Sequence, residues 1–142
     1  MKKLTMIIAL GFGSTLTYAQ KVQEAEVPAS VKTTFKKEYP SVKEAKWEKE
    51  KGNYEASFDL NKVDNSVLID AQGNLIEKEV EIELKQLPQG VLEYVKKNYA
   101  GKEPKEAAKI TDAKGVVTYE AEMKGMDILF DSTGKFLKEV KD

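Results

Sequence analysis

The side chains best suited to acid–base chemistry in this sequence are carboxylates. The chain has 142 residues, 24 of them acidic, and no His or Cys. Two carboxylates that flank a glycosidic bond can act as acid and base in its hydrolysis. Here, alternation with apolar residues predicts a solvated sheet face, so a carboxylate-only hydrolase is the less favoured interpretation. The candidate carboxylates are Glu55, Glu77, Glu79, Glu81, Glu83, Glu120 and Glu122.

The missing residue types exclude several other chemistries. Without His or Cys, the chain has no Ser-His-Asp or Cys-His nucleophile and no ordinary zinc or copper site. Neither GxGxxG nor GxxxxGK occurs after residue 20, so no phosphate-binding loop is predicted. We therefore predict no catalytic residue, no cofactor and no metal ligand.

One polar stretch, residues 59–65, offers Asp and Asn oxygens of the kind that calcium prefers. An EF-hand loop, however, has Gly at its sixth position and Glu at its twelfth, where this sequence has Asp64 and Asp70. The polar residues of this stretch suit a hairpin loop better. Cation binding here stays open as an alternative.

Segments that begin with Asp and end three residues later with Gly recur along the chain. Asp can accept a hydrogen bond from the backbone two residues on, and Gly can take the positive φ that follows a type I turn. These segments predict hairpin turns, and they also explain Asp131-Ser132-Thr133-Gly134, which is one residue too long for an aspartic-protease Asp-Thr-Gly. The three segments are residues 70–73, 112–115 and 131–134.

The two halves of the chain repeat the same motifs in the same order, about 60 residues apart by direct count. Each half has an apolar residue before Pro, then Lys-Lys, Lys-Glu-Ala, Tyr-Glu-Ala and Asp-x-x-Gly. In the first half these motifs begin at Val27, Lys36, Lys43, Tyr54 and Asp70, and in the second at Leu87, Lys96, Lys105, Tyr119 and Asp131. Such a repeat predicts one supersecondary unit used twice.

Each repeat opens with a predicted helix. Val31, Phe35 and Tyr39 are spaced by four and share one face, as do the equivalent residues of the second half. Pro28 and Pro88 suit the first position of a helix. Pro40 ends the first helix, and Ala100-Gly101 ends the second.

Predicted strands follow each helix. Apolar and polar residues alternate from Tyr54, from Tyr119 and around Val80, which indicates a sheet with one covered and one wet face. Short turns between consecutive strands indicate antiparallel pairing. The predicted fold class is α+β, with two tandem helix-plus-meander repeats whose helices pack on one face of an antiparallel sheet.

The N-terminus has the pattern of a secretory signal peptide. Lys2 and Lys3 precede an uncharged apolar run, and small residues follow, so cleavage is expected near Ala19. The run is shorter than the roughly 20 residues that a membrane span needs. We expect a signal peptide over residues 1–19, a linker over 20–26, and repeats over 27–84 and 85–142 in one compact domain. A periplasmic or secreted location follows.

The charge of the mature chain excludes one class of partner. Removal of Lys2 and Lys3 leaves 21 basic residues, all Lys, against 24 acidic ones, a net charge of −3. A chain without Arg or a basic surplus lacks the electrostatic signature of a nucleic-acid binder. No later segment is apolar enough to span a membrane.

The doubled Tyr-Glu-Ala and Asp-x-x-Gly motifs, each preceded by a helix, resemble the PepSY signature. A chain with a signal peptide and two such units is similar to the PepSY-like, β-lactamase-inhibitor-like exported proteins. The resemblance covers nearly all of the mature chain. It implies the fold of the β-lactamase inhibitor protein (BLIP), in which helices pack on one face of an antiparallel sheet.

The resemblance implies an exported, non-enzymatic binding protein with a protein or peptide partner in the cell envelope, acting as inhibitor or regulator of an envelope hydrolase or protease. A small-ligand or cation carrier is one alternative. Trp47 and Tyr54 are expected in the core because Tyr54 shares parity with Phe58. The expected partner-binding sheet face comprises Lys46, Glu48, Glu55, Ser57, Lys78, Glu79 and Glu81.

Overall fold

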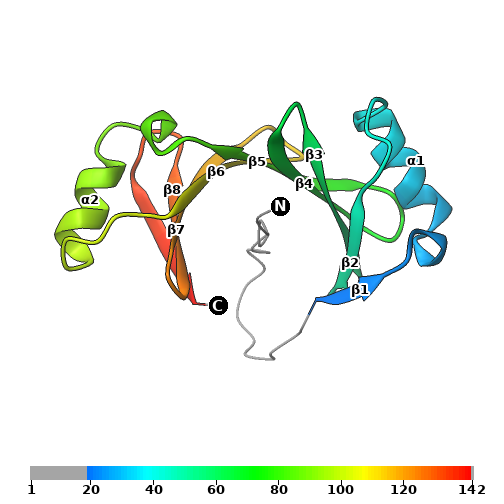
Figure 1. The fold of residues 1–142 in the computed structure, drawn as a ribbon, viewed down its shortest axis with the longest axis horizontal. Coiled ribbons are helices and arrows are strands. Elements are labelled where there is room, and N and C mark those ends of the chain that lie inside the picture. Colours follow the sequence, from blue (N-terminus) through cyan, green and yellow to red (C-terminus); the bar gives the residue numbers. More distant parts are fainter. Residues whose placement is uncertain (1–18, 142) are drawn as a thin grey trace. The chain divides into compact units, whose positions relative to one another are not determined.

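The computed structural model describes residues 19–141, and these form an α+β fold of two α-helices and nine strands (Figure 1). The helices are α1 (Ala29–Glu38) and α2 (Val91–Asn98). The described residues divide into two compact units, residues 19–78 (unit 1) and 79–141 (unit 2). The strands are β1 (Gln20–Val22), β2 (Lys46–Glu50), β3 (Asn53–Leu60), β4 (Val63–Ile69), β5 (Leu75–Ile82), β6 (Glu106–Asp112), β7 (Val117–Met123), β8 (Met126–Asp131) and β9 (Phe136–Lys141).

In unit 1, β1 to β4 pair antiparallel in chain order, and α1 covers one side of them (Figure 1). Val31 and Phe35 of α1 are buried, as their spacing predicts. The Phe35 ring meets the rings of Trp47 and Phe58 edge-on, at centroid distances of 5.2 and 5.3 Å. Trp47 and Tyr54 both belong to this cluster, which confirms that they are core residues.

Unit 2 repeats the arrangement with α2 and β6 to β9, again antiparallel in chain order. Val91 and Val95 of α2 are fully buried against Ala121, Ile128 and Phe130. The corresponding helix and strand residues of the two halves therefore make equivalent cores. This confirms the predicted fold class and the tandem repeat.

The Asp-x-x-Gly segments form hairpin turns with one shared geometry, as predicted. In each, Asp Oδ1 accepts hydrogen bonds from the backbone N–H groups two and four residues on. Gly73 has φ +91° and lies so close to α1 that an added Cβ would be 2.9 Å from the carbonyl oxygen of Ser30. The Thr34 hydroxyl donates to the Gly73 carbonyl at 2.6 Å, so this turn is docked on the helix as well as joining two strands.

Two local features differ from the sequence prediction. Residues 20–26, expected as a linker, contain β1 and a 3-10 helix, η1 (Glu24–Glu26). Val22 pairs with Trp47 and packs on the unit 1 core. This explains why a strand forms here although the sequence shows no alternating pattern. Helix α1 begins directly after Pro28, but α2 begins three residues after Pro88, following a second 3-10 helix, η2 (Leu84–Gln86).

No helix within residues 19–141 is both long and apolar enough to cross a membrane. The predicted signal peptide lies almost wholly outside the described residues.

Candidate binding face

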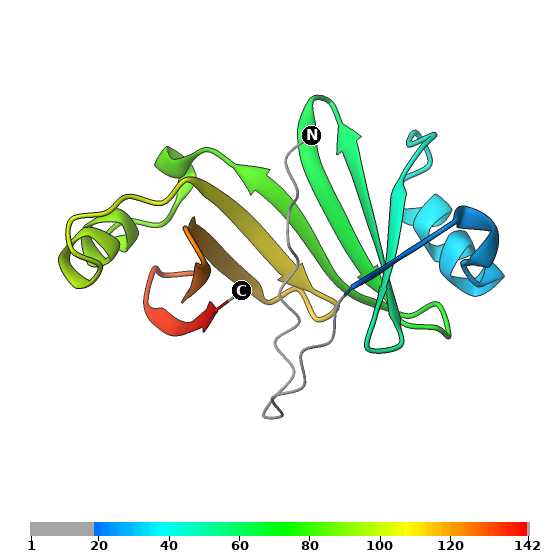
Figure 2. The ribbon, with the colours of Figure 1, turned by 60° about the horizontal axis from the view of Figure 1, so that its bottom comes forward.

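Helix α1 lies on one side of the unit 1 strands (Figure 2), and strand register places most of the predicted partner-binding residues on the other side. Side chains alternate along a strand, so residues one position from the core residues point to the opposite side. Trp47, Ala56 and Val67 belong to the core. The register of the strands then shows which of the remaining side chains lie on the opposite side. We call this side the open face; its residues are Lys21, Lys46, Glu48, Glu50, Glu55, Ser57, Ser66 and Leu68.

The open face is not uniformly solvated, which corrects the sequence prediction. Lys46 is exposed, and Glu48 and Ser57 are half-buried. Glu55, however, is only 7% exposed, and Ser66 is fully buried. The physical reason is that Glu55 lies on a central strand between Glu48 and Leu68, and Leu68 is itself buried.

Burial gives the Glu55 carboxyl unusual proton affinity. Loss of solvation raises the pKa of Glu55 from 4.5 to about 7, and the nearby carboxylates of Glu48, Glu50 and Glu77 add to the rise. The Ser66 hydroxyl lies close enough to lower this pKa in part, although the pair falls outside ordinary hydrogen-bond geometry. A carboxyl group that is half-protonated near neutral pH was not predicted, and it is typical of functional sites.

The three predicted site residues of β5 do not all lie together. Lys78 is paired with Glu38 of α1 and lies over the Tyr39 ring, so it is on the helix side and its predicted place on the open face is wrong. Neighbouring residues of a strand point to opposite sides, so Lys78 and Glu79 could not share a face. Glu79 is fully buried and Glu81 half-buried in the part of β5 that belongs to unit 2. Both take part in interactions.

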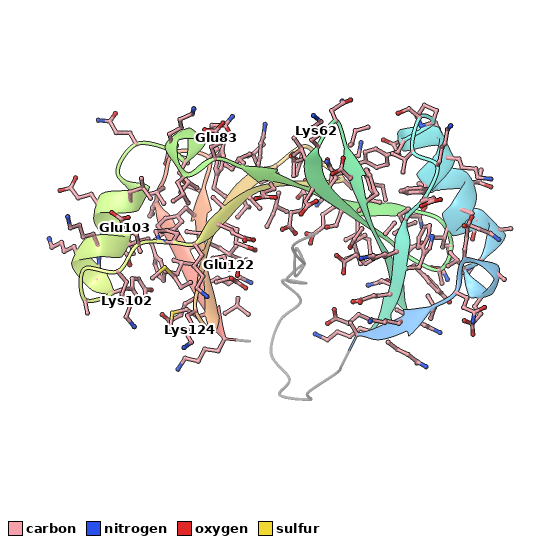
Figure 3. All side chains as sticks on the ribbon, viewed as in Figure 1. Lys62, Glu83, Lys102, Glu103, Glu122 and Lys124 are labelled. Atoms are coloured by element: carbon pink, nitrogen blue, oxygen red, sulfur yellow. The ribbon has the colours of Figure 1, made fainter. Side chains whose placement is uncertain are left out.

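Unit 2 repeats the buried glutamate. Glu120 is the counterpart of Glu55 in the second Tyr-Glu-Ala motif; it is 4% exposed and lies opposite Leu129, as Glu55 lies opposite Leu68. Its neighbour on the other side is Ala108 rather than a second glutamate. Glu122, two residues on, projects from the side of β7 that faces away from α2 (Figure 3). The two units thus share a buried carboxyl but differ in the residue opposite it on the preceding strand.

Residues 59–65, the stretch with calcium-type oxygens, form a tight hairpin. Asn61 and Lys62 both have positive φ, which gives a two-residue turn between β3 and β4, with Lys62 at its tip (Figure 3). Asp59 Oδ1 accepts the Lys62 N–H at 2.8 Å, and the Asn65 amide donates to the Val63 carbonyl. These polar groups therefore serve the hairpin. No group of three or more carboxylates within residues 19–141 is arranged to hold a metal ion.

The fold has relatives of known structure. A putative periplasmic protein from Bacteroides eggerthii superimposes with a TM-score of 0.68 at 21% identity, over 81% of this chain and 88% of that one. A DUF2874 family protein from Bacteroides uniformis gives 0.67 at 24% identity, over 80% and 88%. A BLIP-like protein from Bacteroides fragilis gives 0.59 at 21% identity, over 80% and 86%. These likenesses concern the fold alone, and no curated protein matches the sequence.

The family model described as putative beta-lactamase-inhibitor-like, PepSY-like matches the sequence twice, over residues 15–77 and 75–138. The two matches follow the two halves that share helix, meander and Asp-x-x-Gly turn. They also agree with the resemblance drawn from the Tyr-Glu-Ala and Asp-x-x-Gly motifs. The chain belongs to the PepSY-like, β-lactamase-inhibitor-like family.

Proposed function

We propose that this chain is an exported, non-enzymatic binding protein that works in the periplasm or outside the cell after cleavage near Ala19. Its partner is a protein or peptide of the cell envelope. Inhibition or regulation of an envelope hydrolase or protease is the role that the family description favours. The periplasmic and BLIP-like descriptions of proteins with the same fold support this proposal.

The observation that carries the proposal is the chemistry of the open face. α1 packs on the other side of β2 to β4, so the residues of the open face take no part in the unit 1 core. Burial of an ionisable group at Glu55 works against stability, because its charged form is disfavoured in the folded chain. Carboxyl groups with strongly shifted pKa values cluster at functional sites.

A capture experiment tests the proposal. The mature chain is immobilised and exposed to an envelope extract of the source cell. The matched variant exchanges two charges on the open face, Lys46→Glu with Glu48→Lys, so its net charge is unchanged. The control exchanges two charges elsewhere, Lys36→Glu with Glu44→Lys. We expect one specific protein to bind the wild type and the control but not the open-face variant; equal capture by all three baits contradicts the proposal.

The raised pKa of Glu55 also bears on the two alternatives, a cation carrier and a carboxylate-only hydrolase. A carboxyl with a pKa near 7 can act as a general acid, so the prediction that the candidate carboxylates lie on a solvated sheet face is wrong for Glu55. Hydrolysis needs, besides a second carboxylate such as Glu48, a sugar held between the two groups at a fixed separation. Binding of a partner needs only the charge of the Glu55 carboxylate, and we therefore favour a binding function over hydrolysis.

A further inference from the structure

We infer that Glu55 and Ser66 form a site on the open face for the ammonium group of a lysine side chain, presented by the protein partner. This inference rests on the proposed binding function and names the chemistry that recognises the partner. Nothing in the family description or in the descriptions of the fold relatives assigns a role to these two residues.

The first argument is that the buried Glu55 carboxyl is incompletely hydrogen-bonded. Glu55 pairs with Leu68, and Ser57 with Ser66, so Glu55 and Ser66 are diagonal neighbours on adjacent strands. Glu55 is 7% exposed, and Ser66 is fully buried. Glu55 Oε1 and Ser66 Oγ are both buried, and neither makes a hydrogen bond of ordinary geometry, although the Ser66 hydroxyl lies close enough to lower the pKa of Glu55. Buried polar groups are nearly always fully satisfied, so a carboxylate oxygen with only this weak partner indicates a place for a further donor.

The second argument is the kind of donor that fits. A lysine ammonium carries three donors and no acceptor, and it is compact. Glu55 and Ser66 supply two acceptors, and Glu48 of β2 lies directly opposite Glu55 of the adjacent strand β3. A calcium ion needs six to eight oxygens, whereas no group of three or more carboxylates in the described part of the chain is arranged for a metal. An ammonium group therefore suits the site better than a metal ion.

The third argument is the charge around the site. Negative side chains outnumber positive ones near Glu55, and their combined field favours a cation. The same field raises the proton affinity of Glu55, so a bound ammonium displaces a proton from the carboxyl. The groups that face Glu55 are Glu48 and Glu50 from β2, Ser66 and Leu68 from β4, and Glu77 from β5; the cations on the face are Lys21, opposite Glu48, and Lys46, opposite Ser57.

Calorimetry with a short peptide tests the site. The probe is an acetylated and amidated peptide of alternating Lys and Ala, and its control carries acetyl-lysine at every Lys. Because only the ionised carboxyl is competent, affinity should be about tenfold higher at pH 8 than at pH 6. Titration at pH 7 in two buffers of different ionisation enthalpy should show release of about half a proton per peptide. No binding of the lysine peptide overturns the inference.

Two variants keep the result specific to these residues. Glu55→Gln should weaken binding and abolish both the pH dependence and the proton release. Ser66→Ala should bind a few-fold more weakly, and its affinity profile should move to higher pH because the hydroxyl no longer lowers the pKa of Glu55. The control, Glu44→Gln, removes an exposed carboxylate outside the open face and should match the wild type. Unchanged proton release in Glu55→Gln overturns the inference.

Two comparisons complete the test. One distinguishes a lysine of a protein from a free polyamine, and the other distinguishes failure of the lysine site from failure of the proposed binding function. Spermidine offers the same ammonium chemistry without a peptide backbone, and tighter binding of spermidine than of the peptide contradicts a protein partner. In the capture experiment, Glu55→Gln should lose the partner that the wild type recovers. If the variant recovers it equally well, the lysine site is refuted while the binding function stands.

Discussion

Replacement of the buried Glu55 by Gln should stabilise the protein, and only at neutral to alkaline pH. Gln has the shape of Glu but carries no charge, so it removes the cost of a desolvated carboxylate. Burial raises the pKa of Glu55 from 4.5 to about 7. The folded wild type therefore favours the protonated form, and the stability that this form contributes is complete below pH 4.5 and lost as the pH rises through 7.

The size of the effect follows from the same two pKa values. Each pKa unit corresponds to about 1.4 kcal/mol, so the wild type should lose about 3 kcal/mol between pH 4 and pH 8 through Glu55 alone. Glu55→Gln lacks this loss. For a chain of this length, that difference corresponds to roughly 10 °C in Tm.

Urea and thermal unfolding, followed by circular dichroism at pH 4 and pH 8, measure this difference. An unsatisfied buried amide would lower the stability of the variant equally at both pH values, so the gain between them is the diagnostic quantity. Glu44→Gln, at an exposed position, should follow the wild type at both pH values. If Glu55→Gln and the wild type respond to pH in parallel, the assignment of a buried, half-protonated carboxyl is refuted.

Three further predictions concern the turns, the core and the proposal that the chain is not an enzyme. Gly73→Ala should cost more than Gly115→Ala in urea unfolding, by about 1–3 kcal/mol, because both glycines have positive φ but only at Gly73 would the new Cβ meet backbone; equal losses would refute the docking of the turn on α1. Trp47→Ala should destabilise by about 3–5 kcal/mol, since the ring is buried beside Phe35, whereas Leu137→Ala, at a 49% exposed position, should stay within about 0.5 kcal/mol of the wild type. Chromogenic glycosides incubated with the mature chain should show no turnover above buffer between pH 5 and pH 8; turnover abolished by Glu55→Gln would favour the hydrolase alternative.

The sequence predicted the fold because its signals are local and occur twice. Helix α1 follows from apolar residues spaced by four, such as Val31 and Phe35, which are buried as expected. The turns follow from Asp and Gly at fixed positions, and Asp70 and Asp131 make the same backbone hydrogen bonds. Interactions within a few residues depend little on the rest of the chain, so pattern reasoning captures them.

Strict alternation in β3 predicts one wet face, whereas Glu55 of this strand is buried. The neighbouring strand gave a contrary signal, since Val67, Leu68 and Ile69 are a continuous apolar run and all three are buried. Such a run indicates a strand covered on both faces. Register then places Leu68 beside Glu55, and pairing between strands is a non-local property that this sequence alone did not supply.

The central claim is that the open face holds a buried carboxyl that binds a lysine of the partner. Direct titration of the Glu55 carboxyl tests this claim most closely. The ¹³C chemical shift of its Cδ atom can be followed by NMR from pH 3 to pH 9, without and with the lysine peptide. We predict a midpoint near pH 7 in the free protein, in accord with its burial, and a midpoint moved toward 4.5 when the peptide is bound. A midpoint near 4.5 in the free protein, or one that the peptide leaves in place, would contradict this account.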